Sequence, residues 1–209
     1  MFLKVHTENP QGRHITHAVE ILRNDGIIIY PTDTVYGIGC SIYSKIAIEQ
    51  IYQIKNQNPS KPFSFVCSDL SHISEYAVVS NPAYRVMKHL IPGPFTFILP
   101  ASRLKQLPKS LMSKRKTVGI RVPNNKIALA IVKELGHPIL SASVTDDAGF
   151  VINNPEIIRQ EFENRVDLII DGGINISEPS TVLDFTEEPP VVVREGAGDV
   201  SELLTLASV

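Results

Sequence analysis

The stretch AVEILRNDGIIIYPTDTVYGIG, residues 18–39, passes from an amphipathic segment through a turn into an apolar run. Apolar residues before Gly26 follow the i, i+3, i+4, i+7 spacing of one helix face, namely Ile15, Ala18, Val19 and Leu22. We expect Gly26 to end this helix, because glycine is common just beyond helix C-termini. The run IIIYP, residues 27–31, is apolar on consecutive positions, as in a buried strand. The stretch predicts a helix followed by a buried strand.

The same alternation of β-rich runs and amphipathic segments continues along the chain. Further helices are predicted at 44–56, from Asn81 and Pro82, at 125–135, and from Asn154 and Pro155. Further strands are predicted at FSFVC (63–67), FTFIL (95–99), TVGIRV (117–122), PILSAS (138–143), VDLIID (166–171), and a closing hairpin of STVLDF (180–185) and PVVVRE (190–195). Strands separated by helices indicate an α/β protein, and the hairpin predicts a mixed sheet. Without repeats or Gly/Ser-rich linkers, we expect one domain over residues 1–209.

Composition excludes several classes of protein. The chain has 209 residues, of which 43% are hydrophobic and 20% charged, close to globular averages. Its longest apolar runs hold four or five residues, far short of the ~20 that a membrane span needs. The N-terminus has no basic region before a hydrophobic core, and Cys40 and Cys67 are too few for a disulfide framework. We expect a soluble, reduced, cytoplasmic protein.

The charge is unevenly distributed, although the net charge is only −2. Residues 76–133 carry 11 Lys and Arg and no acidic residue, whereas residues 134–209 carry 3 Lys and Arg against 15 Asp and Glu. A stretch without acids creates a positive field suited to phosphates of a nucleotide or an RNA. The alternative is that the acidic C-terminal third packs against this stretch and cancels its charge.

Several familiar site motifs are missing from the sequence. There is no GxxxxGK[ST] phosphate loop and no GxGxxG after a strand. His14 and His17 have a metal-compatible spacing, but no further ligands complete a set of four, so we interpret them as surface or capping residues. Ser141 and Ser143 are not within a GxSxG motif, which argues against a serine hydrolase.

Small hydroxyl residues and cations instead gather near the ends of predicted strands. In YPTDTVYGIG (30–39), two threonines and two glycines follow the first strand. Hydroxyls and backbone N–H groups there suit a small polar ligand outside a strand end, although a purely structural turn is the alternative. The same pattern recurs at Lys55, Lys61, Thr117, Arg121, Ser141, Ser143, Ser180 and Arg194.

These motifs, taken in order, resemble the YrdC/YciO family. The segments that carry the resemblance are PTDTVYGIG (31–39), IYQIKNQNPSKP (51–62), PGPFTFIL (92–99), TVGIRVP (117–123), PILSAS (138–143), DLIIDGG (167–173), PSTVLDF (179–185) and VVVREGAGD (191–199). The resemblance implies a twisted, open mixed sheet flanked by helices, with a large, positively charged cavity. It also implies synthesis of threonylcarbamoyl-AMP from L-threonine, bicarbonate and ATP with Mg²⁺, a product used in the threonylcarbamoyl-adenosine modification of tRNA.

The resemblance assigns roles to individual residues. Lys55 matches the lysine of the family's K-x-R motif and is the candidate catalytic residue. The positions that match threonine-binding residues are Thr34, Arg121, Ser141 and Ser180. The positions that match ATP-binding residues are Lys61, Thr117, Ser143 and Arg194. An arginine is well suited to a carboxylate because it forms a bidentate charged pair. No dedicated metal ligands are expected, because phosphates and water supply most of the octahedral shell of Mg²⁺.

Two departures from the synthase pattern indicate the YciO-like branch. Gln57 stands where the synthases have the arginine of K-x-R, and Ser143 stands where they have an asparagine. Lys61 stands where an asparagine is common, and it partly restores the missing charge. Loss of one positioned donor typically costs about 3 kcal/mol of transition-state stabilisation, or ~10²-fold in rate. We therefore expect ligand binding to be retained better than catalysis.

Two other functions remain open from the sequence. One is a tRNA- or double-stranded-RNA-binding protein without synthase activity, using the basic stretch 76–133. Against it, Phe95 and Phe97 alternate within a predicted buried strand, so a base-stacking platform is not evident. The other is an ATP-dependent enzyme with a different acceptor, suggested by Gln57 and Ser143.

Overall fold

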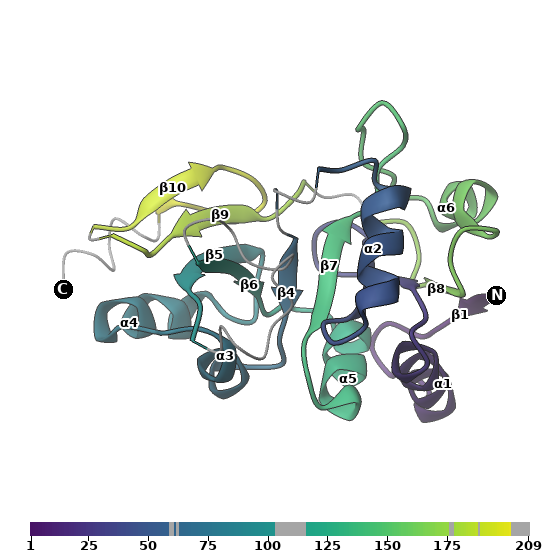
Figure 1. The fold of residues 1–209 in the computed structure, drawn as a ribbon, viewed down its shortest axis with the longest axis horizontal. Coiled ribbons are helices and arrows are strands. Elements are labelled where there is room, and N and C mark those ends of the chain that lie inside the picture. The colour runs from purple at the N-terminus through teal and green to yellow at the C-terminus, as the bar shows by residue number, and fades with distance from the viewer. Residues whose placement is uncertain (59–60, 62, 103–115, 176–177, 188, 202–209) are drawn as a thin grey trace.

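The strands form a ten-stranded mixed sheet in the computed structural model, which describes residues 1–58, 61, 63–102, 116–175, 178–187 and 189–201 (Figure 1). The strands are β1 (Phe2–Lys4), β2 (Ile28–Tyr30), β3 (Gly37–Ser41), β4 (Ser64–Val66), β5 (Phe95–Pro100), β6 (Thr117–Arg121), β7 (Ile139–Ser143), β8 (Leu168–Asp171), β9 (Thr181–Asp184) and β10 (Val191–Arg194). The helices are α1 (Gly12–Arg23), α2 (Lys45–Ile54), α3 (Leu70–Tyr76), α4 (Asn81–Leu90), α5 (Lys126–Leu135) and α6 (Pro155–Phe162).

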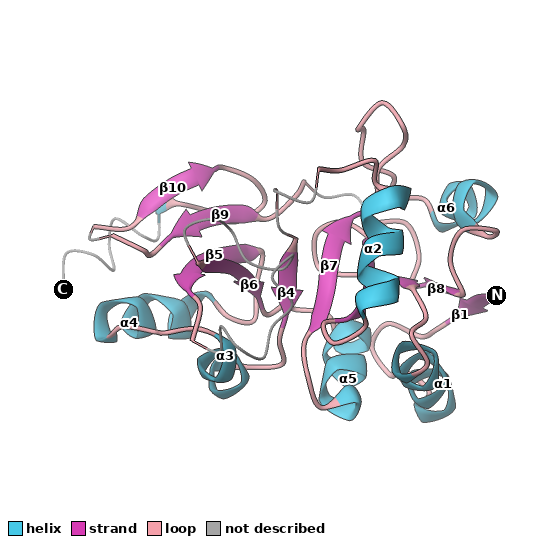
Figure 2. Ribbon diagram, in the orientation of Figure 1, coloured by secondary structure: helices cyan, strands magenta, loops and turns pink. Residues whose placement is uncertain are grey.

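The strand order is β1-β8-β2-β3-β7-β4-β6-β5-β9-β10. The pairs β1/β8, β2/β8, β4/β6 and β5/β9 are parallel, and the remaining neighbours are antiparallel. The predicted α/β class and mixed sheet are confirmed, as is the closing hairpin of β9 and β10. Figure 2 shows the helices arranged around this sheet. Among the helices that the structure describes, none combines the length and apolar character of a membrane span.

Two apolar cores form on the sheet. One joins α1 and α5 to strand residues that include Ile28, Ile139 and Leu168. The other joins α2, α3, α4 and α6 to the opposite side chains of the strands, such as Phe65 and Phe97. On β7, Ile139 belongs to the first core, and Ser141 and Ser143 lie on the same face because side chains alternate along a strand. The sheet face that packs against α1 and α5 therefore becomes polar farther along β7.

Helix faces match the sequence prediction better than helix ends do. The four predicted apolar residues of α1 are all buried. Gly26 does not provide the left-handed residue after α1; Asp25, with φ 60°, does. The N-cap of α4 is Ser80, whose Oγ accepts a hydrogen bond from the Ala83 N–H, and not Asn81. Gly136 adopts φ 81° just after α5 and provides the left-handed residue at that helix end.

Three elements were not predicted. They are β1, the seven-residue α3, and β3, which lies within the glycine-containing segment after the first predicted strand. The sequence of β3, GIGCS, includes two glycines, which are depleted in strands because they contribute no side chain to packing. Gly39 is required there, because a Cβ on it would lie 2.5 Å from the Leu140 carbonyl oxygen. A Cβ on Gly37 would lie 2.9 Å from Ser141 Oγ and would displace that hydroxyl.

Gly136→Ala is expected to destabilise the protein by about 1 kcal/mol, because alanine is strained at positive φ. Among the described residues, no heavy atom lies within 4 Å of the added Cβ, so the loss reports backbone strain alone. Thermal unfolding should show a melting temperature lower by about 2–4 °C. Gly12→Ala is the matched control, because its Cβ also meets nothing within 4 Å and its φ is ordinary. Equal melting temperatures for both variants would show that the positive φ of Gly136 does not disfavour alanine.

Candidate functional site

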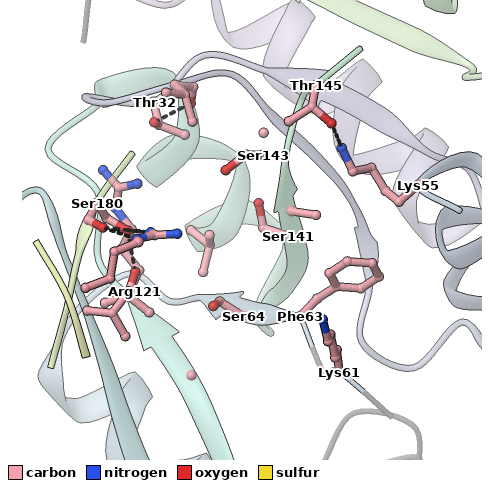
Figure 3. A pocket seen from close by; sticks show the side chains of 18 of the residues that line it. Thr32, Lys55, Lys61, Phe63, Ser64, Arg121, Ser141, Ser143, Thr145 and Ser180 are labelled. Carbon is pink, nitrogen blue, oxygen red and sulfur yellow. Dashed lines mark hydrogen bonds between the residues drawn. The ribbon is translucent and has the colours of Figure 1, made fainter. Parts of the chain in front are cut away.

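A pocket of about 700 Å³ lies over the face of the central strands (Figure 3). Because side chains two positions apart share a strand face, β6 presents Thr117, Gly119 and Arg121 to it, and β7 presents Ser141 and Ser143. Strands β3, β4, β5, β9 and β10 also contribute lining residues. The floor of the pocket is therefore the sheet face itself, whereas the sequence predicted a ligand site outside the strand ends.

Arg121 is fixed at one side of the pocket by two neighbours from the PTDT segment. Its Nη2 lies 2.5 Å from Asp33 Oδ1, and its Nη1 donates to Thr34 Oγ1 at 2.6 Å. Its side chain and that of Asp33 are only 10% and 13% exposed. Burial lowers the pKa of Arg121, and the charge of Asp33 opposes this effect. Each terminal nitrogen of a guanidinium carries two hydrogens, so one on each remains for a ligand.

Thr34 lies behind Arg121 and is not a lining residue of the pocket. It is fully buried, and its Oγ1 lies 3.2 Å from Thr32 Oγ1. Thr32 lines the pocket and donates its hydroxyl to the Val35 carbonyl at 2.7 Å. Asn175 donates to the Thr32 carbonyl at 2.9 Å. The geometry places Thr34 as a partner of Arg121.

Ser180 lies on the same side of the pocket as Arg121 (Figure 3), and Arg194 is hydrogen-bonded to Ser180. Arg194 Nη2 donates to the Ser180 carbonyl at 2.7 Å, and Ser180 Oγ lies 2.8 Å from Thr96 Oγ1. Burial lowers the pKa of Arg194. Gly196, two residues after Arg194, packs against the backbone of residues 179–180. A Cβ on Gly196 would lie 2.1 Å from the Pro179 carbonyl oxygen. The turn after β10 therefore needs glycine to bring Arg194 against Ser180.

Lys55 approaches the pocket from the end of α2, on the opposite side from Arg121 in Figure 3. Its Nζ donates to Thr145 Oγ1 in the loop after β7. Burial lowers the pKa of Lys55, and the charge of Arg165 adds to the effect, while Asp146 opposes it. One ammonium hydrogen is used by Thr145, which leaves two donors.

Gln57 and Lys61 complete this side of the pocket. Gln57 Nε2 donates to the Lys61 carbonyl at 2.9 Å, and Tyr52 Oη donates to the same oxygen at 3.3 Å. Tyr52 also stacks on Phe63, with ring centroids 4.5 Å apart. The backbone of Lys61 is held in place, and its side chain lines the pocket. Gln57 contributes a neutral amide beside the two lysines of this side.

The structure brings together eight of the nine site residues predicted from the sequence. They are Lys55, Lys61, Thr117, Arg121, Ser141, Ser143, Ser180 and Arg194, and Thr34 lies one hydrogen bond behind them. Sequence reasoning missed Asp33, Ser64, Thr96 and Thr145. Asp33 lies inside the motif that was singled out, so its charge next to two threonines was an available signal. Thr145 had no local signal, because its role depends on a loop reaching α2.

The acid-free stretch 76–133 contributes Thr96, Ile98, Thr117, Gly119 and Arg121 to the pocket lining, and Arg121 is the cation among these five. Residues 103–115 of that stretch lie outside the described residues. Phe95 and Phe97 are buried, as predicted.

Among the residues that the structure describes, no three or more His, Cys, Asp or Glu side chains are grouped to hold a metal ion. His17 Nδ1 lies 3.8 Å from Glu20 Oε2 on the exposed side of α1.

Comparison with known sequences identifies relatives along almost the whole chain. The Sua5/YciO/YrdC family model, described as "Telomere recombination", matches residues 20–196. An uncharacterized protein of Haemophilus influenzae is 49% identical over 206 residues, which cover 97% of this chain and 99% of that protein. The uncharacterized protein YciO of Escherichia coli is 46% identical over 205 residues, covering 97% and 98%. Threonylcarbamoyl-AMP synthase of Bacillus subtilis is 31% identical over 192 residues, covering 91% of this chain and 54% of the synthase.

Solved structures give the same relationship. The crystal structure of E. coli YciO has a TM-score of 0.90 at 46% identity and covers 96% of this chain and 97% of that one. The crystal structure of P. abyssi Sua5 complexed with L-threonine has a TM-score of 0.92 at 27% identity, covering 99% of this chain and 60% of that one. Family model, sequence relatives and fold agree, and the chain belongs to the Sua5/YciO/YrdC family, with greater similarity to these YciO proteins than to the synthases.

Proposed function

We propose that the protein is an ATP-dependent L-threonylcarbamoyladenylate synthase, whose product serves tRNA threonylcarbamoyl-adenosine modification. The pocket carries the proposal: seven residues that the family resemblance assigns to threonine or ATP, together with the candidate catalytic Lys55, line one cavity. Relatives named threonylcarbamoyl-AMP synthase, and the Sua5 structure complexed with L-threonine, support it. Gln57 and Ser143 make us expect a slower enzyme than the synthases.

The proposed reaction has two steps. The threonine amine attacks bicarbonate, forming a carbamate with loss of water; a carbamate oxygen then attacks the α-phosphorus of ATP, and pyrophosphate leaves. Arg121 binds the threonine carboxylate through its two free Nη hydrogens. Lys55 and Lys61 face the phosphates, where positioned cations stabilise the charge on the transferring group. Ser141 and Ser143 present hydroxyls between the two sides.

The Ser141 hydroxyl is oriented by Tyr30, whose Oη donates to Ser141 Oγ at 2.7 Å. Burial raises the pKa of Tyr30 to about 12, so the phenol keeps its proton near neutral pH. With its oxygen accepting from Tyr30, the Ser141 hydrogen is free to point into the pocket. Tyr30 is thereby a positioning residue that makes Ser141 a donor.

Magnesium fits this pocket only as a companion of ATP. The described lining residues offer hydroxyls but no carboxylate. The phosphates and water would supply most ligands of Mg²⁺, whose charge offsets that of the phosphates. Thr117 and Ser143 are the lining hydroxyls that the resemblance places at the nucleotide.

Pyrophosphate release tests the proposal directly. The purified protein is incubated with Mg-ATP and bicarbonate, with and without L-threonine, and pyrophosphate is measured over time. Threonine-dependent release supports the synthase. Release that does not depend on threonine points to a different acceptor, and no release while ATP binds argues for a non-catalytic, RNA-binding role.

Gln57→Arg combined with Ser143→Asn is expected to raise turnover by at least ~10-fold, because each change restores one donor at the phosphate side. An arginine at position 57 retains an N–H for the Lys61 carbonyl that Gln57 now holds. Gln57→Glu is the matched control of opposite charge and should lower turnover. An unchanged rate in the double variant would mean that these two positions do not limit the reaction.

A further inference from the structure

Ser64 occupies the centre of the pocket floor. As the first residue of β4, it is in register with Ser141 on β7 and with Gly119 on β6. Residues paired across neighbouring strands project to the same face of the sheet. Ser64 and Ser141 therefore stand side by side on the pocket face, and Figure 3 shows both in the pocket.

The register also places Ser64 between Arg121 and two hydroxyls that the resemblance assigns to the nucleotide. One step along the same face, Arg121 pairs with Val66. Thr117 and Ser143 lie on the same face in the opposite direction. Thr117 is two residues before Gly119 on β6, and Ser143 is two residues after Ser141 on β7, which runs antiparallel to β4. The row of Gly119, Ser64 and Ser141 thus separates the arginine that faces the amino acid from the hydroxyls assigned to the nucleotide.

Space around the Ser64 hydroxyl is kept open by glycine. A Cβ built on Gly119 would lie 2.9 Å from Ser64 Oγ, and one built on Gly37 would lie 2.9 Å from Ser141 Oγ. Each serine of the row is therefore flanked by a glycine on one neighbouring strand. A side chain at either glycine would push the adjacent hydroxyl away from its position.

The two hydroxyls differ in their partners. Ser141 Oγ accepts from Tyr30, whereas the Ser64 hydroxyl has no hydrogen-bond partner among the residues that the structure describes. Ser64 is half-buried, so its hydroxyl is partly removed from bulk water. A half-buried hydroxyl without a protein partner, at the junction of two substrate positions, is available as a donor to a ligand.

We propose that Ser64 is a further binding residue of this pocket, donating its hydroxyl to an anionic oxygen where the amino acid meets the nucleotide. The oxygen belongs either to the carboxylate or carbamate of the amino acid or to a phosphoryl group of ATP. This assignment rests on the proposed synthase function. Ser64 and Ser141 together form a pair of adjacent donors at the reacting centre.

The test compares Ser64→Ala with the wild type in three measurements: binding of L-threonine, binding of ATP, and threonine-dependent pyrophosphate release. We expect turnover to fall by about 10- to 100-fold. Weaker threonine binding would place the contact on the amino acid, weaker ATP binding would place it on a phosphate, and a loss confined to turnover would place it on the oxygen at the reacting centre.

Two further variants separate this effect from damage to the fold. Gly119→Ala leaves Ser64 in place but displaces its hydroxyl, and it should reproduce the loss. Ser74→Ala removes a hydroxyl that donates to the Leu70 carbonyl within α3 and does not line the pocket, and it should leave turnover unchanged. Wild-type binding and turnover in Ser64→Ala would overturn the assignment while the synthase stands. A wild type without threonine-dependent turnover would overturn both.

Discussion

Arg121→Lys is expected to weaken L-threonine binding by about 100-fold, equivalent to about 3 kcal/mol. A guanidinium presents donors in a planar fork that matches a carboxylate, and the compact ammonium of lysine does not. In this protein the fork is already oriented by Asp33 and Thr34, at 2.5 and 2.6 Å. A lysine at position 121 would lack the second donor to the ligand, and it would not be held by both Asp33 and Thr34. Calorimetric titration with L-threonine measures the change.

Arg159→Lys is the control for this substitution. Arg159 is about half exposed on α6, where it pairs with Glu163 at 3.3 Å. Threonine binding should be the same in that variant and in the wild type, because Arg159 is not among the residues that line the pocket. If Arg121→Lys binds threonine within threefold of the wild-type affinity, Arg121 does not bind the carboxylate.

Asp33→Ala is expected to lower the free energy of unfolding by about 3 kcal/mol, because it leaves the charge of Arg121 buried without a counter-charge. The two side chains are 10% and 13% exposed, so water screens the pair only weakly. Chemical unfolding in urea, followed by circular dichroism, gives the change. The expected fall in melting temperature is about 6–12 °C for a chain of this length.

A second substitution tests the cause of that loss. Adding Arg121→Met to Asp33→Ala removes the unpaired charge and should recover part of the lost stability. Glu163→Ala, which breaks the exposed pair with Arg159, should cost less than 1 kcal/mol. Similar small losses for Asp33→Ala and Glu163→Ala would show that the buried pair is not an important stabilising feature.

Much of the fold was predictable because its signals are local. The apolar spacing of α1, the asparagine and proline that begin α6, and the left-handed Gly136 after α5 all depend on residues within one or two turns. Strand β3 was missed for the opposite reason. Its glycines weaken every local strand signal, and they are explained only by the close approach of β7, about a hundred residues later.

The site was predictable as a set of residues but not as a geometry. Hydroxyls and cations at separate motifs indicated a polar ligand, and the family resemblance assigned them to threonine and ATP. Thr34 shows what the sequence could not predict. Only the structure reveals that its hydroxyl accepts a hydrogen bond from Arg121 and that it does not line the pocket. Ser64 shows the same limit. It lies in a predicted strand, but the pairing of β4 between β7 and β6 puts it beside Ser141 and Gly119.

The most direct test of the account is the product formed from ¹³C-bicarbonate, L-threonine and Mg-ATP. Because the carbamate carbon comes from bicarbonate, the account predicts threonylcarbamoyl-AMP that is one mass unit heavier than the product made from ordinary bicarbonate. Pyrophosphate should form in equal amount, and at an L-threonine concentration that just saturates the wild type both should fall sharply in Arg121→Lys. Binding of ATP and threonine without any labelled adenylate would contradict the synthase.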